Sequence, residues 1–398
     1  MSARGQRPRV FMMDLWATVP YYTAYLSKAL LKQPVDLTTG SITYYLDPAC
    51  FTSRAINIDP GLLDIVGKFR LSRLPRRVLK LLEGIINLSA LAVRFLVSVP
   101  DIIHVQYLPM LKTWLPLDLW FVNLCRWRGA KIVLTVHDLL PHDTGETYRA
   151  TFDALYRSAD ALICHSDAIR ARLAAEFSVP EEKVSVIPHG PFFYDLPLVG
   201  SEDILQSFAI DPGQTMVLWQ GIIFPYKGID LLLRAWQQVE AKVANVCLVI
   251  AGTGAPDLLE EIREQVLQLG LKRVKMHFRF ISSEELVTLY RAADVVVYPY
   301  RAITTSGALA TGLALGKTIV ASDLPVFREL LTDAENALLV APLDYDALAG
   351  ALITLSQDAA LRERLAGKVR AMNFGDQSWI SIAERTMDAY NSVLSRPS

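Results

Sequence analysis

Short apolar stretches alternate along the chain with longer segments in which apolar positions recur every three or four residues. The short stretches are rich in valine, isoleucine and leucine, which is typical of parallel strands buried on both faces, and the longer ones have the spacing of helices that bury one face. We predict strands at Arg9–Asp14, Ile102–Gln106, Lys131–Thr135, Ala161–Cys164, Val184–Ile187, Met216–Gln220, Val246–Ala251, Val274–Phe278, Val295–Tyr298 and Thr318–Ala321. We predict helices at Tyr21–Leu31, Thr147–Ser158, Ala168–Phe177, Ile229–Ala241, Asp257–Leu269 and Glu284–Ala292.

The alternation of strand and helix runs through the first half of the chain and starts again in the second. Strands separated by helices predict a parallel sheet with helices on both faces. The segment Phe192–Gln214 is rich in proline and glycine and marks a loop between the halves. At 398 residues the chain is long enough for two cores. We therefore expect an α/β protein with two doubly wound, Rossmann-like domains, residues 1–195 and 196–375, that face a central ligand cleft.

Composition adds a question about membranes. The chain is 52% hydrophobic and 20% charged, and its mean hydropathy of +0.27 is high for a soluble protein. The best candidate for a membrane span, Leu81–Val99, is interrupted by Glu83 and Arg94. The first residues pass from a short basic tail directly into the first strand, so we expect no secretory signal and a cytoplasmic location. Four widely separated cysteines fit a reduced compartment: Cys50, Cys125, Cys164 and Cys247.

The stretch Val295–Ser322 carries the first candidate site. Between its two strands, Ser306 is a plausible N-cap, Gly307 lies in the first turn, and the helix Ala308–Leu315 is apolar on nearly every side. The helix would begin just beyond the carboxyl end of a parallel strand, where unpaired N–H groups bind anions, and the hydroxyl groups of Thr304 and Thr305 lie beside it. A phosphate fits this pattern. An ordinary crossover, in which the loop only caps its helix, fits it equally well.

Lys227 is the second candidate. It lies in a loop bracketed by Gly221 and Gly228, between the strand Met216–Gln220 and the helix that begins at Ile229. Because this loop and the loop before Ser306 both follow strands of one parallel sheet, they should project from the same edge. Lys227 could neutralise a diphosphate there as a point charge, although a loop lysine is often merely solvated.

Five sequence motifs together resemble glycosyltransferase family four, whose members have the GT-B fold. They are FPYKGIDLLLRAW, AADVVVYPYRAITTSGALATGLALGKTIVASDLPVFRE, KIVLTVHDLLPHD, ADALICHSD and VIPHG. The resemblance covers the chain from about Arg9 to its C-terminus. It extends to the final segment, residues 376–398, where the predicted helix Ile380–Leu394 resembles the family helix that crosses back to the N-terminal domain.

The resemblance implies transfer of a sugar from a nucleotide-diphosphate donor, with retained anomeric configuration and no metal. The family's donor lysine corresponds to Lys227, and the histidine of its N-terminal domain, which reaches the donor sugar or the acceptor, corresponds to His137. Its base contacts, largely to backbone, fall near Phe280, and Gly221 begins the lysine loop. The family's phosphate loop corresponds to Thr304, Thr305, Ser306, Gly307 and Ala308.

The sequence also departs from the family pattern. Two glutamates that flank the family's phosphate loop, the second of which contacts the donor ribose, are replaced by Ile303 and Thr311. The family's diphosphate arginine is replaced by Ile222, and its Gly-Gly loop by Leu15–Thr18. This pattern resembles a branch seen among exopolysaccharide enzymes. It leaves open a non-catalytic nucleotide-sugar-binding protein and, as a third hypothesis, a nucleotide-sugar epimerase.

Four further polar residues are candidates, and three of them have a structural alternative. Asp138 could form a polar pair with His137 at the acceptor, and His189 is a candidate for the same cleft that could equally be a structural loop histidine. Glu329 resembles a family acid near the donor, or it is a charge in the first turn of a helix. Asp344 belongs to an Asp-Tyr-Asp sequence that spells a metal motif of another glycosyltransferase fold, but capping of the following helix is the better interpretation.

A basic stretch between residues 68 and 80 bears on the acceptor. Leucine, valine and phenylalanine are interleaved with its cations, which suits docking on an anionic membrane, and the segment Ile85–Val97 that follows is predicted to be a core helix. A nucleic acid partner is disfavoured by the sequence pI of about 6.6, and a solvated helix end is the plain alternative. The six basic residues are Lys68, Arg70, Arg73, Arg76, Arg77 and Lys80.

We therefore expect a retaining, metal-independent GT-B glycosyltransferase. Its donor would be a nucleotide-diphosphate sugar and its acceptor a saccharide, expected to be linked to a polyprenyl diphosphate, in the assembly of a surface polysaccharide. The protein would act as a peripheral protein on the inner face of the plasma membrane, with no nucleic acid partner.

Overall fold

The computed structural model describes the chain except for residues 1–6, 70–72, 113–114, 141–144, 198–200, 212, 373 and 397–398. The chain forms two compact units. The first consists of Met1–Pro188 with Trp379–Ser398, and the second of His189–Ser378. The predicted limits, after residues 195 and 375, lie close to these divisions, and they would place His189 in the first domain, whereas it belongs to the second unit.

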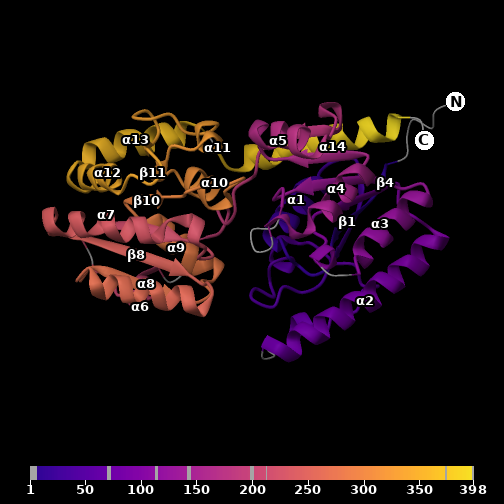
Figure 1. Cartoon of the computed structure of the whole chain (residues 1–398), viewed down its shortest axis with the longest axis horizontal. Coiled ribbons are helices and arrows are strands. Elements are labelled where there is room, and N and C mark those ends of the chain that lie inside the picture. The colour runs from indigo at the N-terminus through magenta and orange to yellow at the C-terminus, as the bar shows by residue number, and fades with distance from the viewer. Residues whose placement is uncertain are drawn as a thin grey trace. The chain divides into compact units, whose positions relative to one another are not determined.

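Each unit is built on one parallel sheet of six strands (Figure 1). In the first unit the strand order is β2-β1-β3-β4-β5-β6, and all neighbours are parallel. This confirms the α/β fold class with two doubly wound domains. The strands are β1 Arg9–Asp14, β2 Asp36–Ser41, β3 Ile102–Val105, β4 Lys131–Val136, β5 Ala161–Cys164 and β6 Val184–Val186.

The central strands of this sheet are buried on both faces, in a core shared with the surrounding helices. The helices are α1 Pro20–Leu30, α2 Arg73–Val97, α3 Leu117–Trp127, α4 Arg149–Ser158, α5 Asp167–Phe177 and α14 Asp376–Ser395. Short 3-10 turns lie at Thr52–Arg54, Val66–Lys68, Pro109–Lys112, Gly145–Tyr148 and Glu181–Lys183.

The helix α2 confirms one prediction in part. The segment Ile85–Val97, predicted to be a core helix, does pack into the core, but it is the second half of a 25-residue helix that begins within the basic stretch. One face packs on the sheet through Leu88, Leu91 and Phe95. The opposite face is exposed although it is apolar, and a helix that is apolar on two faces cannot be told from a buried one by periodicity.

The second unit has the strand order β12-β11-β10-β7-β8-β9, again parallel throughout. Its strands are β7 Thr215–Gln220, β8 Val246–Gly252, β9 Val274–Phe278, β10 Val295–Tyr298, β11 Thr318–Ser322 and β12 Leu338–Val340. Its helices are α6 Ser201–Ser207, α7 Ile229–Lys242, α8 Pro256–Gln268, α9 Ser283–Ala292, α10 Gly307–Ala314, α11 Pro325–Arg328, α12 Tyr345–Gln357 and α13 Ala359–Ala371. A 3-10 turn spans Pro225–Lys227.

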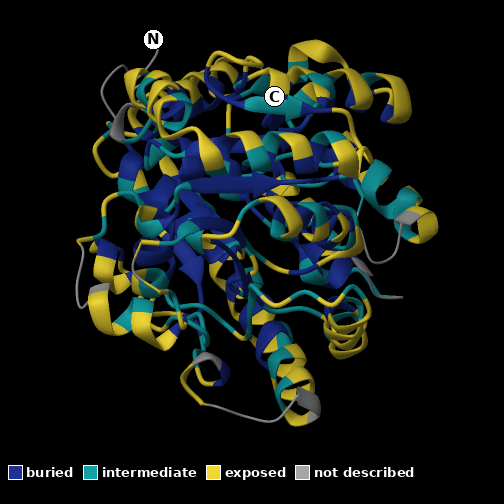
Figure 2. Cartoon of the chain, turned by 90° about the vertical axis from the view of Figure 1, so that its left-hand side faces the viewer, coloured by how far each residue is buried: buried dark blue, intermediate teal, exposed yellow. Residues whose placement is uncertain are grey.

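In Figure 2 the central strands are dark blue, and the helices around them show yellow on their outward sides. Side chains cap several helices of this unit. Ser282 and Glu285 form a capping box on α9, and the Asp344 carboxylate accepts a hydrogen bond of 2.8 Å from the Ala347 N–H at the start of α12. The capping interpretation of Asp344 is therefore confirmed, and the carboxylate of Asp346 is occupied by the side chain of Gln238.

Candidate active site

Two glycines shape the loop that carries Lys227. Gly221, directly after β7, has a φ of 139°, and Gly228 caps α7 with a φ of 68°. A Cβ atom on Gly228 would overlap the backbone oxygen of Pro299, which follows β10. The strands β7 and β10 are parallel neighbours, so the two loops meet at the carboxyl edge of the sheet, as predicted from their positions in the sequence.

Lys227 lies half-buried over two aromatic rings. Its Nζ atom is 5.8 Å from the centre of the Trp219 ring and 5.7 Å from that of Tyr300. A Cβ atom on Gly221 would lie 2.7 Å from the same Nζ atom, so glycine is needed there for the lysine to keep its place. Burial lowers the pKa of Lys227 to about 8. A bound anion would reverse this shift, because an opposite charge favours the ammonium form.

Arg301 is a cation of this region that the sequence did not single out. Its guanidinium pairs with Asp230 at 2.5 Å and donates to the backbone oxygen of Pro225 at 2.7 Å. Ile222, the residue in the position of the family arginine, is exposed. Arg301 therefore ties the segment after β10 to the lysine loop and the first turn of α7, and so it fixes the loop that carries Lys227.

The helix α10 begins where the sequence predicted it. The Ser306 hydroxyl accepts a hydrogen bond of 3.1 Å from the Leu309 N–H, which is the N-cap interaction, and Gly307 is the first helical residue. Two buried phenols, Tyr290 and Tyr298, donate to the backbone oxygen of Ala308 at 3.0 and 2.8 Å. The helix end next to the phosphate-loop candidates is therefore held in place from the sheet side.

Thr311 has a partner on each side of its hydroxyl group. The hydroxyl donates to the backbone oxygen of Gly307 at 2.8 Å and accepts from the N–H of Phe192 at 3.1 Å. The residue is only 2% exposed. In this structure Thr311 thus ties the segment after His189 to α10.

The remaining donor-side candidates lie on loops and a helix end of the second unit. Thr304 and Thr305 are half-buried in the loop before α10, and Phe280 is half-buried after β9. His189 lies beside α10, since a Cβ atom on Gly307 would be 3.0 Å from its ring. Glu329 is exposed at the C-cap of α11, so the expectation that it starts a helix is wrong.

In the first unit, His137 and Asp138 follow β4 at the carboxyl edge of the sheet, and both are half-buried. The His137 ring lies edge-on to Tyr22 with centres 4.8 Å apart. Its Nε2 atom is 3.2 Å from the side-chain oxygen of Gln106, and its Nδ1 atom is 3.4 Å from Nε2 of His165. His137 and Asp138 line a cavity of about 50 Å³, whose other walls are mainly apolar and include Tyr107, Leu111, Phe152 and Tyr156.

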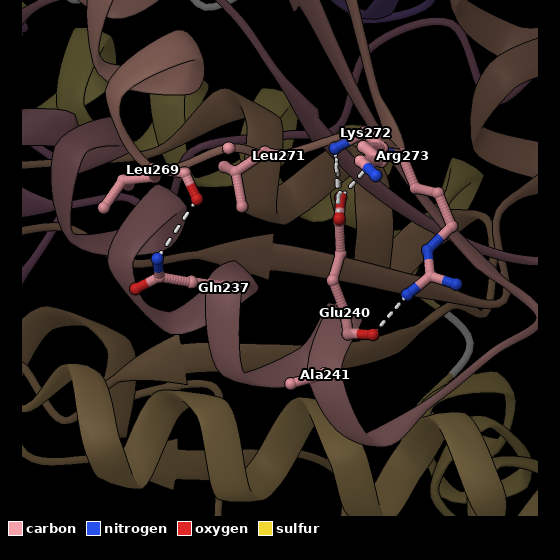
Figure 3. A pocket seen from close by; sticks show the side chains of 8 residues that line it. Gln237, Glu240, Ala241, Leu269, Leu271, Lys272 and Arg273 are labelled. Carbon is pink, nitrogen blue, oxygen red and sulfur yellow. Dashed lines mark hydrogen bonds between the residues drawn. The ribbon is translucent and has the colours of Figure 1, made fainter.

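A larger pocket, of about 470 Å³, lies in the second unit (Figure 3). The Glu240 carboxylate accepts from the backbone N–H groups of Lys272 and Arg273, and the Arg273 guanidinium donates to the backbone oxygen of Glu240. Lys272 and Arg273 directly precede β9 and therefore lie at the amino edge of the sheet, whereas Lys227 lies at the carboxyl edge. Since the polar atoms there bind one another, this pocket is a structural junction between α7 and β9.

The residues of the basic stretch differ in their partners and exposure. Lys68 pairs with Asp64 at 3.4 Å, Arg76 stacks on Tyr45, and Lys80 lies over Trp16, where burial lowers its pKa. Arg77 is exposed. Arg70 and the side chain of Arg73 lie outside the described residues.

The described residues hold neither a cluster of metal ligands nor a helix that could span a membrane. Among them, no three histidine, cysteine, aspartate or glutamate side chains gather in a group that could hold a metal ion. Within the same ranges, no helix combines the length and apolar character needed to cross a bilayer.

Comparison with known proteins places the chain in a family. Residues 19–190 match the model of glycosyltransferase family 4, and residues 200–372 match the model of glycosyl transferases group 1. Over 260 residues the chain is 27% identical to an uncharacterised glycosyltransferase of Methanocaldococcus jannaschii, a match that covers 64% of this chain and 66% of that protein. Over 185 residues it is 30% identical to the phosphatidyl-myo-inositol mannosyltransferase of Mycolicibacterium smegmatis, with 46% of each chain covered.

The matches thus span about half to two thirds of these relatives' own length. A solved structure of Anabaena HepE in complex with UDP and glucose superimposes with a TM-score of 0.74 at 18% identity, and it covers 97% of this chain and 100% of that one. This similarity shows the fold. From the two family models and the fold, the chain belongs to glycosyltransferase family four and has the GT-B architecture.

Proposed function

We propose that the protein is a retaining glycosyltransferase that takes its sugar from a nucleotide-diphosphate donor. One observation carries the proposal: the half-buried Lys227 and the N-terminus of α10 follow neighbouring parallel strands of the second sheet. An ammonium group and the free N–H groups of a helix start are the partners that a diphosphate needs. The HepE structure was solved with UDP and glucose, so UDP-sugars are the first donors to test.

In the proposed reaction the bond between the anomeric carbon and the diphosphate oxygen breaks while a bond to the acceptor oxygen forms on the same face of the sugar. The departing diphosphate oxygen takes the acceptor's proton. Negative charge grows on the diphosphate in the transition state, and Lys227 and α10 stabilise it where it appears. We propose that the reaction needs no metal, so activity in EDTA should equal activity in its absence.

The position of Lys227 predicts a pH dependence. Its folded-state pKa of about 8 lies below the ordinary value of 10.5, so the free enzyme loses the ammonium charge as the pH rises through about 8. We expect kcat/KM for the donor to fall above that pH. The profile of kcat should fall only at higher pH, because a bound diphosphate favours the charged form. Identical upper limbs in the two profiles would contradict this assignment.

We further propose a lipid-linked saccharide acceptor and docking of the first unit on a membrane. A row of apolar side chains runs along the exposed face of α2, each between 51% and 83% exposed: Val78, Leu82, Ile86, Val93 and Val97. The helix α3 packs beside α2 and carries the exposed Trp120 and Trp127 (Figure 1). Exposed aliphatic side chains with tryptophans nearby suit the boundary between headgroups and acyl chains.

The membrane proposal predicts flotation of the protein with vesicles. Vesicles that contain phosphatidylglycerol should carry it upward more strongly than pure phosphatidylcholine, because Arg77 and its basic neighbours add attraction to anionic lipid. The triple change Val78→Ser, Leu82→Ser and Ile86→Ser should reduce flotation at least about tenfold, since it removes apolar area without touching the core. A matched control, Leu267→Ser with Leu343→Ser, changes exposed leucines of the second unit. Equal losses in both variants would contradict docking through α2.

A transfer assay tests the proposed activity itself. The protein is incubated with a nucleotide sugar and a polyprenyl-diphosphate saccharide, and the product's anomeric configuration is read by NMR. We expect a glycoside of the donor's own configuration. Nucleotide binding without transfer to any acceptor would instead favour a non-catalytic nucleotide-sugar-binding protein, an outcome that the occupied hydroxyl of Thr311 and the exposed Ile222 make worth testing.

A further inference from the structure

A chain of hydrogen bonds runs from α14 through strand β3 to the carboxyl edge of the first sheet and includes three histidines. Tyr390 of α14 contacts Nδ1 of His104 at 2.6 Å, and Nε2 of His104 is 3.0 Å from the side-chain nitrogen of Gln106. The oxygen of the same amide is 3.2 Å from Nε2 of His137, whose Nδ1 faces Nε2 of His165 at 3.4 Å. Nδ1 of His165 is 2.9 Å from the backbone oxygen of Ile187.

The backbone oxygen at one end of this chain fixes the proton positions on two rings. A carbonyl oxygen only accepts, so Nδ1 of His165 must carry the proton that it donates to Ile187. His165 is buried, and burial lowers its pKa to about 4, which keeps the ring neutral with a lone pair on Nε2. That lone pair accepts from Nδ1 of His137, which is therefore protonated.

The orientation of the Gln106 amide fixes the other side of His137. The amide nitrogen lies 3.0 Å from the sulfur of Met12 and 3.0 Å from Nε2 of His104. A thioether sulfur can accept a hydrogen bond and cannot donate one, so the NH₂ end of the amide belongs on that side. The oxygen end then faces Nε2 of His137, and this nitrogen must donate as well.

We propose that Gln106 and His165 hold the ring of His137 in its doubly protonated, imidazolium form. The inference deepens the proposed function and rests on it for its consequence. A ring that already carries both protons cannot take one from the acceptor, so His137 would act by its charge, with Gln106 and His165 as positioning residues. The single step it excludes is general base catalysis by this histidine.

Several titratable groups surround the ring. Asp138 follows it in the chain and lines the same cavity. Tyr22 of α1 lies edge-on to it, and burial raises the pKa of that phenol, so Tyr22 stays neutral. Beyond Gln106, burial lowers the pKa of His104 to about 3, so His104 also stays neutral.

Nitrogen NMR of the full chain labelled with [¹⁵N]histidine tests the proposal directly. The sequence holds six histidines, and the signals of His137 are identified by their loss in His137→Gln. The spectrum is recorded without substrates, about one pH unit above the ordinary histidine value of about 6.5. We expect His137 to show two protonated nitrogens, and His104 and His165 one each. One unprotonated nitrogen on wild-type His137 would overturn the proposal.

Two variants then test the part played by Gln106. In Gln106→Leu the acceptor oxygen is gone, and His137 should lose one proton at the same pH. Gln106→Glu keeps an acceptor in place and should keep both protons. A doubly protonated His137 in Gln106→Leu would show that Gln106 does not hold the second proton on the ring. If that variant does not fold, the spectra of the wild type and of Gln106→Glu still test whether His137 carries two protons. Since no donor or acceptor is present, failure here is distinct from failure of the proposed transfer reaction.

Discussion

Replacement of Lys227 by alanine should lower turnover about 10²- to 10³-fold, the effect expected when a group that stabilises transition-state charge is removed. The loss should appear in kcat and in kcat/KM, because the ammonium group interacts most strongly with the diphosphate as it departs. The fold should not suffer. Burial of an ammonium group costs free energy. Without bound ligand, Lys227→Ala should therefore melt at the same temperature as the wild type or at a higher one.

Lys317 offers a matched control for this change. It is also half-buried, burial lowers its pKa to about 8 as well, and its Nζ atom donates to the backbone oxygen of Arg291 at 3.0 Å. It directly precedes β11 and therefore lies at the amino edge of the same sheet. Lys317→Ala should leave turnover unchanged. Unchanged turnover in Lys227→Ala, or an equal loss in both variants, would remove Lys227 from the proposed site.

Replacement of Gly228 by alanine should destabilise the second unit by about 2–5 kcal/mol. The left-handed φ of 68° costs a residue with a side chain about 1–2 kcal/mol, and forced displacement of packed atoms adds about 1–3 kcal/mol. The new methyl group would overlap the backbone oxygen of Pro299, which cannot rotate away as a side chain can. Because the loops after β7 and β10 would be pushed apart, donor binding should weaken together with stability.

Amide hydrogen exchange in β7 and β10 measures this destabilisation within the unit, and Gly350→Ala is its control. Gly350 is exposed in α12, and a Cβ atom there would meet nothing within 4 Å. In that helix, alanine should stabilise the protein by about 0.5–1 kcal/mol. If exchange in β7 and β10 were as slow in Gly228→Ala as in the wild type, the close approach of the two loops would be refuted.

The fold could be predicted where the chain is buried on both faces. The strands Ala161–Cys164 and Val295–Tyr298 were predicted to the residue, since short runs of apolar side chains bounded by polar loops leave little choice. The edge strand β2 was missed because its sequence, DLTTGS, is polar and only its last three residues are buried. The exposed face of α2 was missed because it is apolar, like the part of the helix that packs into the core.

Of the candidate site, too, the sequence predicts some features and not others. Ser306 and Lys227 could be found from local spacing, because an N-cap and a loop between two glycines are features of neighbouring residues. The partners of Thr311 and His137 could not. The Thr311 hydroxyl binds the N–H of Phe192, 119 residues away, and the amide that contacts His137 comes from Gln106, directly after another strand. Nothing local in the sequence marks such pairs.

Thermal stabilisation by nucleotides tests most directly the central claim, that the carboxyl edge of the second sheet binds the diphosphate of a nucleotide sugar. The wild type and Lys227→Ala are melted with a panel of UDP-, GDP- and ADP-sugars and the free nucleotides. A ligand at about 100 times its Kd stabilises by about 2.7 kcal/mol, so one nucleotide family should raise the Tm of the wild type and leave that of the variant nearly unchanged. No shift with any nucleotide, or equal shifts in both proteins, would contradict the claim.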